Sequence, residues 1–276
     1  MNPIPQTNEY DALIQRIQRK RKAVIVSTVI VLVIAGILCS PIYIETFRGV
    51  VVDYAGIHPV WRTLVFLLVL LCGIVAYALV SAPLTTSMET ECDPQKHLML
   101  NTVLNKQKNK NQIYATDFLY MGNFEAALHY ANQMVADNNP KVTMVGLFNR
   151  ARCAFFMHDE ELLETTAQQY ENMLRTVKIR GSADQTTLNA IQQTMQLMVS
   201  ISRQDAESIA RLRNIEAWSS TQAAQGYMSY LKGVGAYLVG DRQEAIYRLM
   251  FVKEHCAKTV LASLAESYLS EWNTDA

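Results

Sequence analysis

The sequence predicts an all-α membrane protein, in which a two-helix transmembrane hairpin precedes a cytosolic solenoid of helical hairpins. Two long apolar runs without a charged residue lie near the N-terminus, at 23–44 and 63–84. The whole chain contains only 11 Gly and 7 Pro in 276 residues, which is too few for a turn-rich β-sandwich. A helix–turn–helix pattern recurs beyond residue 111, and such recurrence is typical of a repeat architecture.

Composition and charge exclude several classes of protein. Hydrophobic residues make up 50% of the chain, too many for a disordered protein. Because 25 Lys and Arg balance 25 Asp and Glu, the chain has no net basic charge for binding nucleic acid. The five cysteines form no C-x-x-C pair. In a reducing compartment we expect them to be free thiols that pack as small hydrophobic side chains.

The two apolar runs are predicted to be membrane spans. The first, 23–44, has 22 residues without a charge, enough for a helix to cross a hydrocarbon core of about 30 Å. The second, 63–84, is equally long. A cleaved signal peptide is the alternative for the first run. That alternative is disfavoured because the polar segment 1–22 precedes the run and no small-x-small cleavage site follows it.

Basic residues predict the orientation of the hairpin. Segment 1–22 carries five Lys or Arg, whereas the connecting loop 45–62 carries two. Lysines also follow the second span. Basic residues are retained on the cytoplasmic side, so both termini should be cytoplasmic and the loop extracytoplasmic. No motif marks a eukaryotic organelle, and we expect a bacterial cytoplasmic (plasma) membrane.

A linker and lead-in helix are predicted at 85–110, followed by a repeat domain at 111–276. In D-F-L-Y-M-G-N-F-E-A-A-L-H-Y-A, an apolar helix ends at Gly122-Asn123 and a second helix begins. The segment G-V-G-A-Y-L-V-G-D-R-Q-E-A-I-Y-R-L has the same layout at Gly240-Asp241. The segment A-R-C-A-F-F-M-H-D-E-E-L-L-E places His158-Asp159 at this turn, and M-V-S-I-S-R-Q-D-A-E-S-I-A gives a fainter version near Ser202.

This pattern resembles the tetratricopeptide repeat, whose first helix ends in Gly-Asp or Gly-Asn and whose second opens near Glu-Ala. From Gly122 to His158, Ser202 and Gly240 the turns are 36, 44 and 38 residues apart, each longer than the family period of about 34. An inserted loop at 176–185 accounts for the longest interval. The resemblance implies stacked hairpins with a concave groove, and segment 259–272 is expected to cap the stack.

The resemblance also implies which side chains face the groove, and aromatic residues dominate them. The candidate partner-binding residues are Tyr120, Phe148, Arg152, Tyr227, Tyr230 and Tyr237. Rings on a concave surface suit an extended or helical peptide. The alternative is that many of these rings fill the space between hairpins. A site for a chain-terminal carboxylate is not expected, because among the groove positions only Arg152 and Asn149 are suited to hold one.

No catalytic, cofactor-binding or metal-binding residue is predicted. Histidines are scattered, and no Gly-rich phosphate loop or G-x-S-x-G motif occurs. The run Glu254-His255-Cys256 does not read as a metal site, because neighbouring side chains on a helix diverge by about 100°.

We therefore expect a non-enzymatic, membrane-anchored adaptor that binds a protein or peptide partner on the cytosolic side. Its other partner is the bilayer, through two spans. The alternative is an accessory subunit of a larger membrane complex for transport, secretion or signalling, whose transmembrane helices make the specific contacts. In that case a partner would cover Val50-Val51-Val52 of the outer loop. A third and more distant hypothesis is an enzyme of unfamiliar type that uses Glu254, His255 or Arg152.

Overall fold

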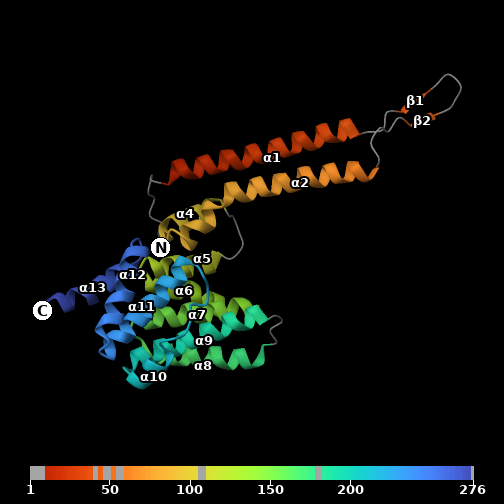
Figure 1. Ribbon diagram of the computed structural model, residues 1–276. Coiled ribbons are helices and arrows are strands. Elements are labelled where there is room, and N and C mark those ends of the chain that lie inside the picture. The colour runs from red at the N-terminus through yellow and green to blue at the C-terminus, as the bar shows by residue number, and fades with distance from the viewer. Residues whose placement is uncertain are drawn as a thin grey trace. The chain divides into compact units, whose positions relative to one another are not determined.

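The computed structural model describes residues 10–39, 43–45, 51–53, 59–104, 110–177 and 182–274. The chain divides into two compact units, Met1–Leu84 and Thr85–Ala276. Within the described residues there are thirteen helices and one pair of three-residue strands (Figure 1). The prediction of a helical fold is therefore confirmed, apart from this strand pair.

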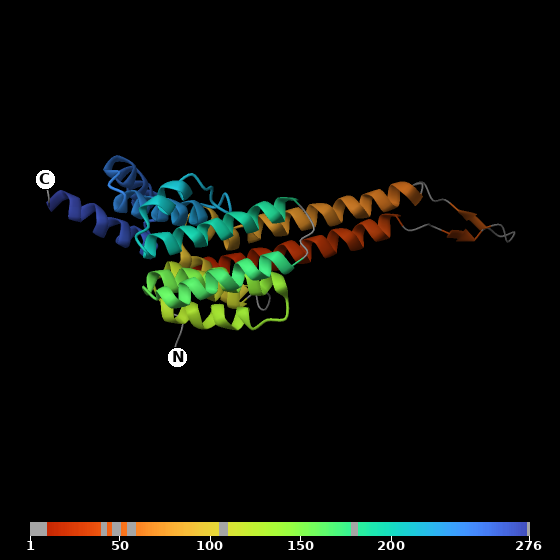
Figure 2. The same cartoon turned by 90° about the horizontal axis from the view of Figure 1, so that it is seen from below.

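The first unit is built on two long helices that lie side by side. These are α1 (Asp11–Cys39) and α2 (Pro59–Ser81) (Figures 1 and 2). A Cβ on Gly73 of α2 would lie 2.6 Å from Cγ2 of Thr28 on α1, closer than two carbons can approach. The missing side chain of Gly73 therefore lets the two helices pack closely, as small residues do between membrane helices.

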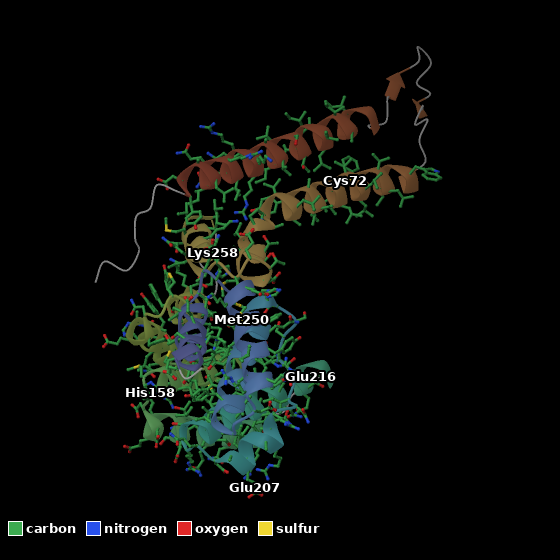
Figure 3. All side chains as sticks on the ribbon, turned by 60° about the vertical axis from the view of Figure 1, so that its left-hand side comes forward. Cys72, His158, Glu207, Glu216, Met250 and Lys258 are labelled. Atoms are coloured by element: carbon green, nitrogen blue, oxygen red, sulfur yellow. The ribbon has the colours of Figure 1, made fainter. Side chains whose placement is uncertain are left out.

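By length and composition, one of the described helices could cross a membrane. It comprises Thr63–Ser81 of α2, with a mean hydropathy of 2.8 and none of its apolar window buried. The side chains along α2 around Cys72 are drawn almost entirely in carbon (Figure 3). An apolar surface of this extent on one helix is the kind that a membrane span presents to lipid.

The predicted end of the first span is wrong. Tyr43 and Ile44, assigned to a helix running over 23–44, lie in strand β1 (Tyr43–Glu45). This strand pairs antiparallel with β2 (Val51–Asp53). The physical reason is local. Proline at position 41 does not continue a helix, and aromatic and β-branched residues favour an extended backbone.

The predicted end of the second span also needs correction. Helix α2 begins at Pro59, and its apolar stretch begins at Thr63 as predicted but ends at Ser81, so Leu84 falls in a separate helix, α3 (Pro83–Glu89). Proline fits the first turn of a helix, so Pro83 starts α3 inside the predicted span, and α3 continues into the region predicted as linker. The expected lead-in helix is α4 (Pro94–Leu104).

The second unit continues as a series of antiparallel helices joined by short turns (Figure 2). They are α5 (Lys110–Tyr120), α6 (Phe124–Val135), α7 (Pro140–Phe156), α8 (Glu160–Thr176), α9 (Ser182–Ser202), α10 (Ala206–Leu212), α11 (Gln222–Leu238), α12 (Arg242–His255) and α13 (Val260–Thr274). The predicted loop at 176–185 is shorter than expected, because α9 already begins at Ser182. Residues 178–181 of that loop lie outside the described part of the chain.

Four of the turns have the same backbone geometry. Each contains one residue with positive φ, and these residues are Gly122, His158, Gln204 and Gly240, at 81°, 55°, 54° and 79°. The next residue caps the following helix by accepting a hydrogen bond from the backbone N–H three positions on. These caps are Asn123, Asp159, Asp205 and Asp241. A left-handed residue followed by a capping Asn or Asp ends one helix and begins the next.

The repeated turns define four helical hairpins, α5–α6, α7–α8, α9–α10 and α11–α12. Their left-handed residues are 36, 46 and 36 residues apart. The third turn therefore lies at Gln204, two residues beyond the predicted Ser202. Glutamine is an uncommon left-handed residue, so the sequence lacked the glycine that marks the first and last turns.

The non-glycine turns offer a direct test of this geometry. Replacing His158 with glycine should raise the free energy of unfolding by up to about 1 kcal/mol, because the left-handed backbone strains a residue with a Cβ. Gly240→Ala should lower it by a similar amount, since the same strain is introduced. Urea unfolding of the full chain in mild detergent, followed by circular dichroism, measures both. Two changes of the same sign would contradict the assignment.

The hairpins of the second unit do not form an open spiral, because contacts distant in sequence bring its two ends together. The hydroxyl of Tyr120 on α5 donates to the carbonyl of Ala223 on α11 at 2.9 Å. The ammonium of Lys258 lies 2.6 Å from the Asp93 carboxylate. The first helices of the first and fourth hairpins, α5 and α11, are thus in contact.

Candidate functional site

The side chain of Arg152 lies where α5 and α11 meet, beside Tyr120 and Tyr227. It projects from α7 and is 3% exposed. Arg150, two residues earlier, points instead toward α8 and donates from Nε to Oγ1 of Thr166 at 2.9 Å. Because residues two apart on a helix point in nearly opposite directions, the two arginines serve different sides of α7.

Four aromatic rings surround the Arg152 guanidinium. Its central carbon lies 4.3 Å from the ring centre of Tyr227, 4.8 Å from Tyr120, 5.3 Å from Phe148 and 5.6 Å from Trp218. At these distances the faces of the rings attract the cation. The rings hold the guanidinium in place, but they do not neutralise its charge.

Part of the hydrogen-bonding capacity of Arg152 is unused. Nη1 donates to Oδ1 of Asn149 at 3.3 Å. Nε and Nη2 are buried, and neither has a hydrogen-bond partner among the described residues. A buried N–H group without a partner costs about 1–3 kcal/mol, so two nitrogens that carry three such groups call for an explanation.

A cavity of about 480 Å³ opens beside Arg152. Besides Arg152, Tyr120, Phe148 and Trp218, its walls carry polar and apolar side chains, among them Gln112, Ile113, Thr116, Val145 and Asn149. The volume falls within the usual range for ligand pockets, about 300–1,000 Å³. The walls combine apolar surface with a few polar groups, which suits a ligand that has both apolar and polar groups.

The structure brings four of the six predicted groove residues together. Tyr120, Phe148 and Tyr227 are three of the four rings around Arg152. Their inward placement follows from their positions on the first helices of the hairpins. Burial raises the pKa of Tyr120 to about 12, although the nearby Arg152 charge opposes this shift. Tyr120 is therefore a neutral hydrogen-bond donor at physiological pH.

The other two predicted residues, Tyr230 and Tyr237, do not line the cavity but pack against Tyr268. The ring of Tyr237 is 5.2 Å from that of Tyr268 on α13, and Tyr230 is 6.5 Å from the same ring. Tyr230 is only 4% exposed. For Tyr230, the alternative that rings fill space between helices is thus the correct one, because α13 covers this part of α11.

Sequence reasoning missed two parts of the site. Trp218 lies in the connection between α10 and α11, and no repeat pattern places a ring from a loop beside Arg152. The second part is a pair formed by His97 on α4 and Asp117 on α5. Nδ1 of His97 lies 2.8 and 2.9 Å from the two carboxylate oxygens of Asp117. His97 also lines the cavity, so the lead-in helix contributes a wall.

Burial makes Asp117 a titratable group of unusual pKa. Desolvation raises its pKa from 3.8 to about 6, and the hydrogen bond with His97 limits the rise. The native carboxyl group binds its proton more readily than the unfolded one. Its contribution to stability is therefore full below about pH 4 and is lost as the pH rises through about 6.

The Asp117→Asn variant should remove this dependence. Between about pH 4 and pH 7, the free energy of unfolding of the unsubstituted protein should fall relative to that of the variant by about 3 kcal/mol. Urea unfolding at several pH values measures the difference. Asp205→Asn is the matched control, because hydrogen bonds with Ser208 hold the pKa of Asp205 below its ordinary value. Its effect should have the opposite sign, and equal slopes in both variants would contradict the assignment.

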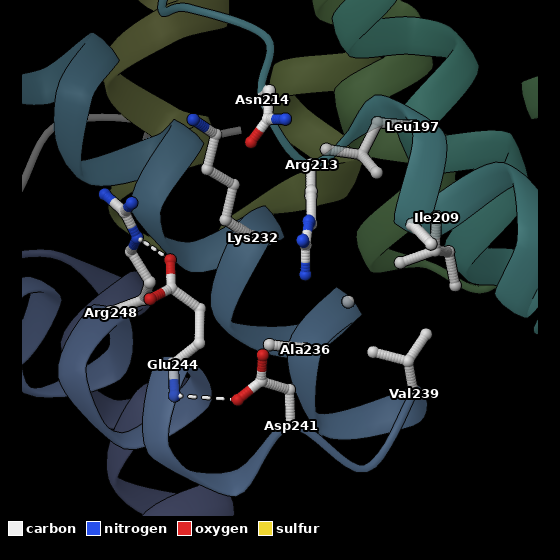
Figure 4. Close-up of a pocket in the computed structure, with 12 residues that line it drawn as sticks. Leu197, Ile209, Arg213, Asn214, Lys232, Ala236, Val239, Asp241, Glu244 and Arg248 are labelled. Atoms are coloured by element: carbon white, nitrogen blue, oxygen red, sulfur yellow. Dashed lines mark hydrogen bonds and ion pairs between the residues drawn. The ribbon is translucent and has the colours of Figure 1, made fainter.

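A second cavity, of about 370 Å³, lies among α9, α10, α11 and α12 (Figure 4). Two of the charged groups there, Arg248 and Glu244, pair with each other. Nε of Arg248 is 2.7 Å from the Glu244 carboxylate, and Asp241 accepts a hydrogen bond from the backbone N–H of Glu244 at 3.2 Å. These interactions stabilise the fourth hairpin and its cap. This cavity is therefore a weaker candidate for a binding site than the cavity at Arg152.

The described residues contain no group of three or more His, Cys, Asp or Glu side chains able to hold a metal ion. In the run Glu254-His255-Cys256, helix α12 ends at His255 and Cys256 is its C-cap, and the side chains of the two residues point to different surroundings. Cys256 is fully buried, 3.3 Å from Sγ of Cys92, whereas the exposed ring of His255 stacks on Phe251.

Comparisons with protein-family models, curated proteins and solved structures give no match for this chain.

Proposed function

We propose that the chain is a non-enzymatic adaptor that is anchored in a membrane and binds a segment of a protein partner in the cavity at Arg152. The observation that carries this proposal is the buried guanidinium, which lines a cavity and has two donors without a partner in the described residues. A structural arginine would have those donors satisfied. The proposed binding residues are Arg152 with Tyr120, Phe148 and Trp218, whereas the fully buried Tyr227 positions the guanidinium.

The proposed anchor is the pair α1 and α2. Helix α2 supports it directly through its exposed apolar surface. The uncharged run that begins at residue 23 supports a second span, because it continues α1 beyond the basic residues of segment 1–22. With those basic residues retained inside, both termini and the helical unit are cytoplasmic. We propose the cytoplasmic membrane of a bacterium.

We further propose that the four hairpins are tetratricopeptide-like repeats. The support is the fourfold turn, with its left-handed residue and its capping Asn or Asp. A small or apolar residue is buried four positions after each cap, and these residues are Ala127, Leu163, Ile209 and Ala245. Such residues let the second helix of each hairpin pack against its neighbours.

The accessory-subunit function remains the second candidate, and one feature favours it. The loop between the long helices contains the paired strands β1 and β2. A two-stranded pair is marginal by itself and exposes edges that a partner could extend. In this function, contacts with other membrane proteins would come from the first unit.

Replacing both long helices with an unrelated transmembrane hairpin separates the two functions. An adaptor should keep its cytosolic partner after the exchange, because the cavity at Arg152 is unchanged. An accessory subunit should lose its membrane partners. Affinity purification of both chains in mild detergent, with mass spectrometry, measures this. Loss of every partner on exchange would overturn the adaptor function.

A further inference from the structure

We propose that the cavity at Arg152 is a carboxylate-binding site, which holds an acidic group of the partner segment on Nε and Nη2. This inference rests on the proposed function and specifies the chemistry of its ligand. It would make Arg152 the residue that determines which segments bind. The surrounding rings would position its guanidinium.

The pattern of unused donors carries the proposal. Nη1 of Arg152 is occupied by Asn149, whereas Nε and Nη2 have no partner in the described part of the chain. Nε–H and one N–H of Nη2 point in parallel along one edge of the guanidinium. A carboxylate bridges such an edge with two parallel hydrogen bonds, which is the geometry that distinguishes arginine from lysine.

The charge balance of the cavity points to the same ligand. Arg152 is a buried cation, and it forms no ion pair with any described residue. The acidic residue that lines this cavity, Glu89, is exposed. An anion from outside the chain would neutralise the guanidinium in a desolvated place, where charge pairing is strong.

The remaining walls suit residues that flank an acidic group. Ile113 and Val145 offer apolar contact, while the amide of Gln112 can bond to a peptide backbone. The bound carboxylate can come from two sources. One is an Asp or Glu side chain within the partner segment, and the other is the C-terminus of the partner chain. The two are distinguished by blocking the terminus.

The test is selection of random peptides by the full chain in mild detergent, once with free and once with amidated C-termini. Selected peptides should share an Asp or Glu at a fixed place, or should require the free terminus. Changing that Asp or Glu to its amide, or amidating that terminus, should weaken binding at least about tenfold, as expected for a lost bidentate pair. Arg152→Lys should weaken it too, because lysine retains the charge but lacks the fork.

Arg150→Met is the matched control, since its side chain points away from the cavity toward Thr166. Binding should survive this change and be lost in Arg152→Met. Circular dichroism of each variant shows that it is folded. Peptides that bind with no acidic requirement would overturn the carboxylate site and leave the adaptor function standing. If no peptide is selected, both proposals fail together.

Discussion

Replacing Arg152 with methionine should raise the free energy of unfolding of the unliganded protein by about 2 kcal/mol. Burying a guanidinium costs several kcal/mol, and two of its nitrogens have no partner among the described residues. Contacts with the four rings recover about 0.5–2 kcal/mol each and offset most of that cost. Methionine keeps much of the volume and leaves no buried charge or unpaired donor.

Urea unfolding of the full chain in detergent measures this gain. Arg150→Met is again the comparison, and it should lose about 1 kcal/mol because a satisfied hydrogen bond to Thr166 is removed. If Arg152 serves binding at a cost in stability, its replacement should raise the free energy of unfolding and abolish binding. If Arg152→Met instead lowers the free energy of unfolding by several kcal/mol, Arg152 has a structural role and the proposed site is wrong.

Replacing Gly146 with alanine should lower the free energy of unfolding by about 3 kcal/mol. Gly146 lies where α7 crosses the end of α6. An added Cβ would be 2.7 Å from Cβ of Met134 and 2.8 Å from the backbone nitrogen of Val135. Backbone atoms cannot turn aside as a flexible side chain can, so the two helices would have to separate.

The sign of the Gly146 effect is the decisive observation. At an open position inside a helix, a change from glycine to alanine is stabilising by about 1 kcal/mol. Thr165→Ala, at an exposed position of α8, provides the control and should change stability little. Thermal unfolding followed by circular dichroism compares the variants. A more stable Gly146→Ala protein would contradict the close crossing of α6 and α7.

Local sequence signals predicted the turns but not the contact between α5 and α11. In Gly122-Asn123 and Gly240-Asp241, a glycine that adopts the left-handed backbone is followed directly by the capping residue. These two turns could therefore be predicted from the sequence. Gln204 gives the same backbone without glycine, and its turn was misplaced by two residues. The pairing of Tyr120 with Ala223 joins residues 103 positions apart. No local pattern encodes such a contact.

The candidate site could be predicted only in part, because some of its residues depend on long-range packing. Arg152, Tyr120, Phe148 and Tyr227 lie on first helices, whose inner positions follow from the repeat. Trp218 comes from a connection, and its place depends on how the third and fourth hairpins pack. Tyr230 follows the pattern, yet it packs against Tyr268 instead of facing a groove. Burial by a distant helix outweighed the position that the pattern implied.

Photo-crosslinking in living cells tests the central claim most directly, with the reactive amino acid placed at Gln112 on the exposed edge of the cavity. A second chain carries it at Thr165, an exposed position on α8 that does not line the cavity. The adaptor function predicts that a cytosolic protein is crosslinked from Gln112 and not from Thr165. The crosslink from Gln112 should disappear when Arg152→Met is added. Crosslinks confined to integral membrane proteins, or a cytosolic crosslink that persists without Arg152, would contradict it.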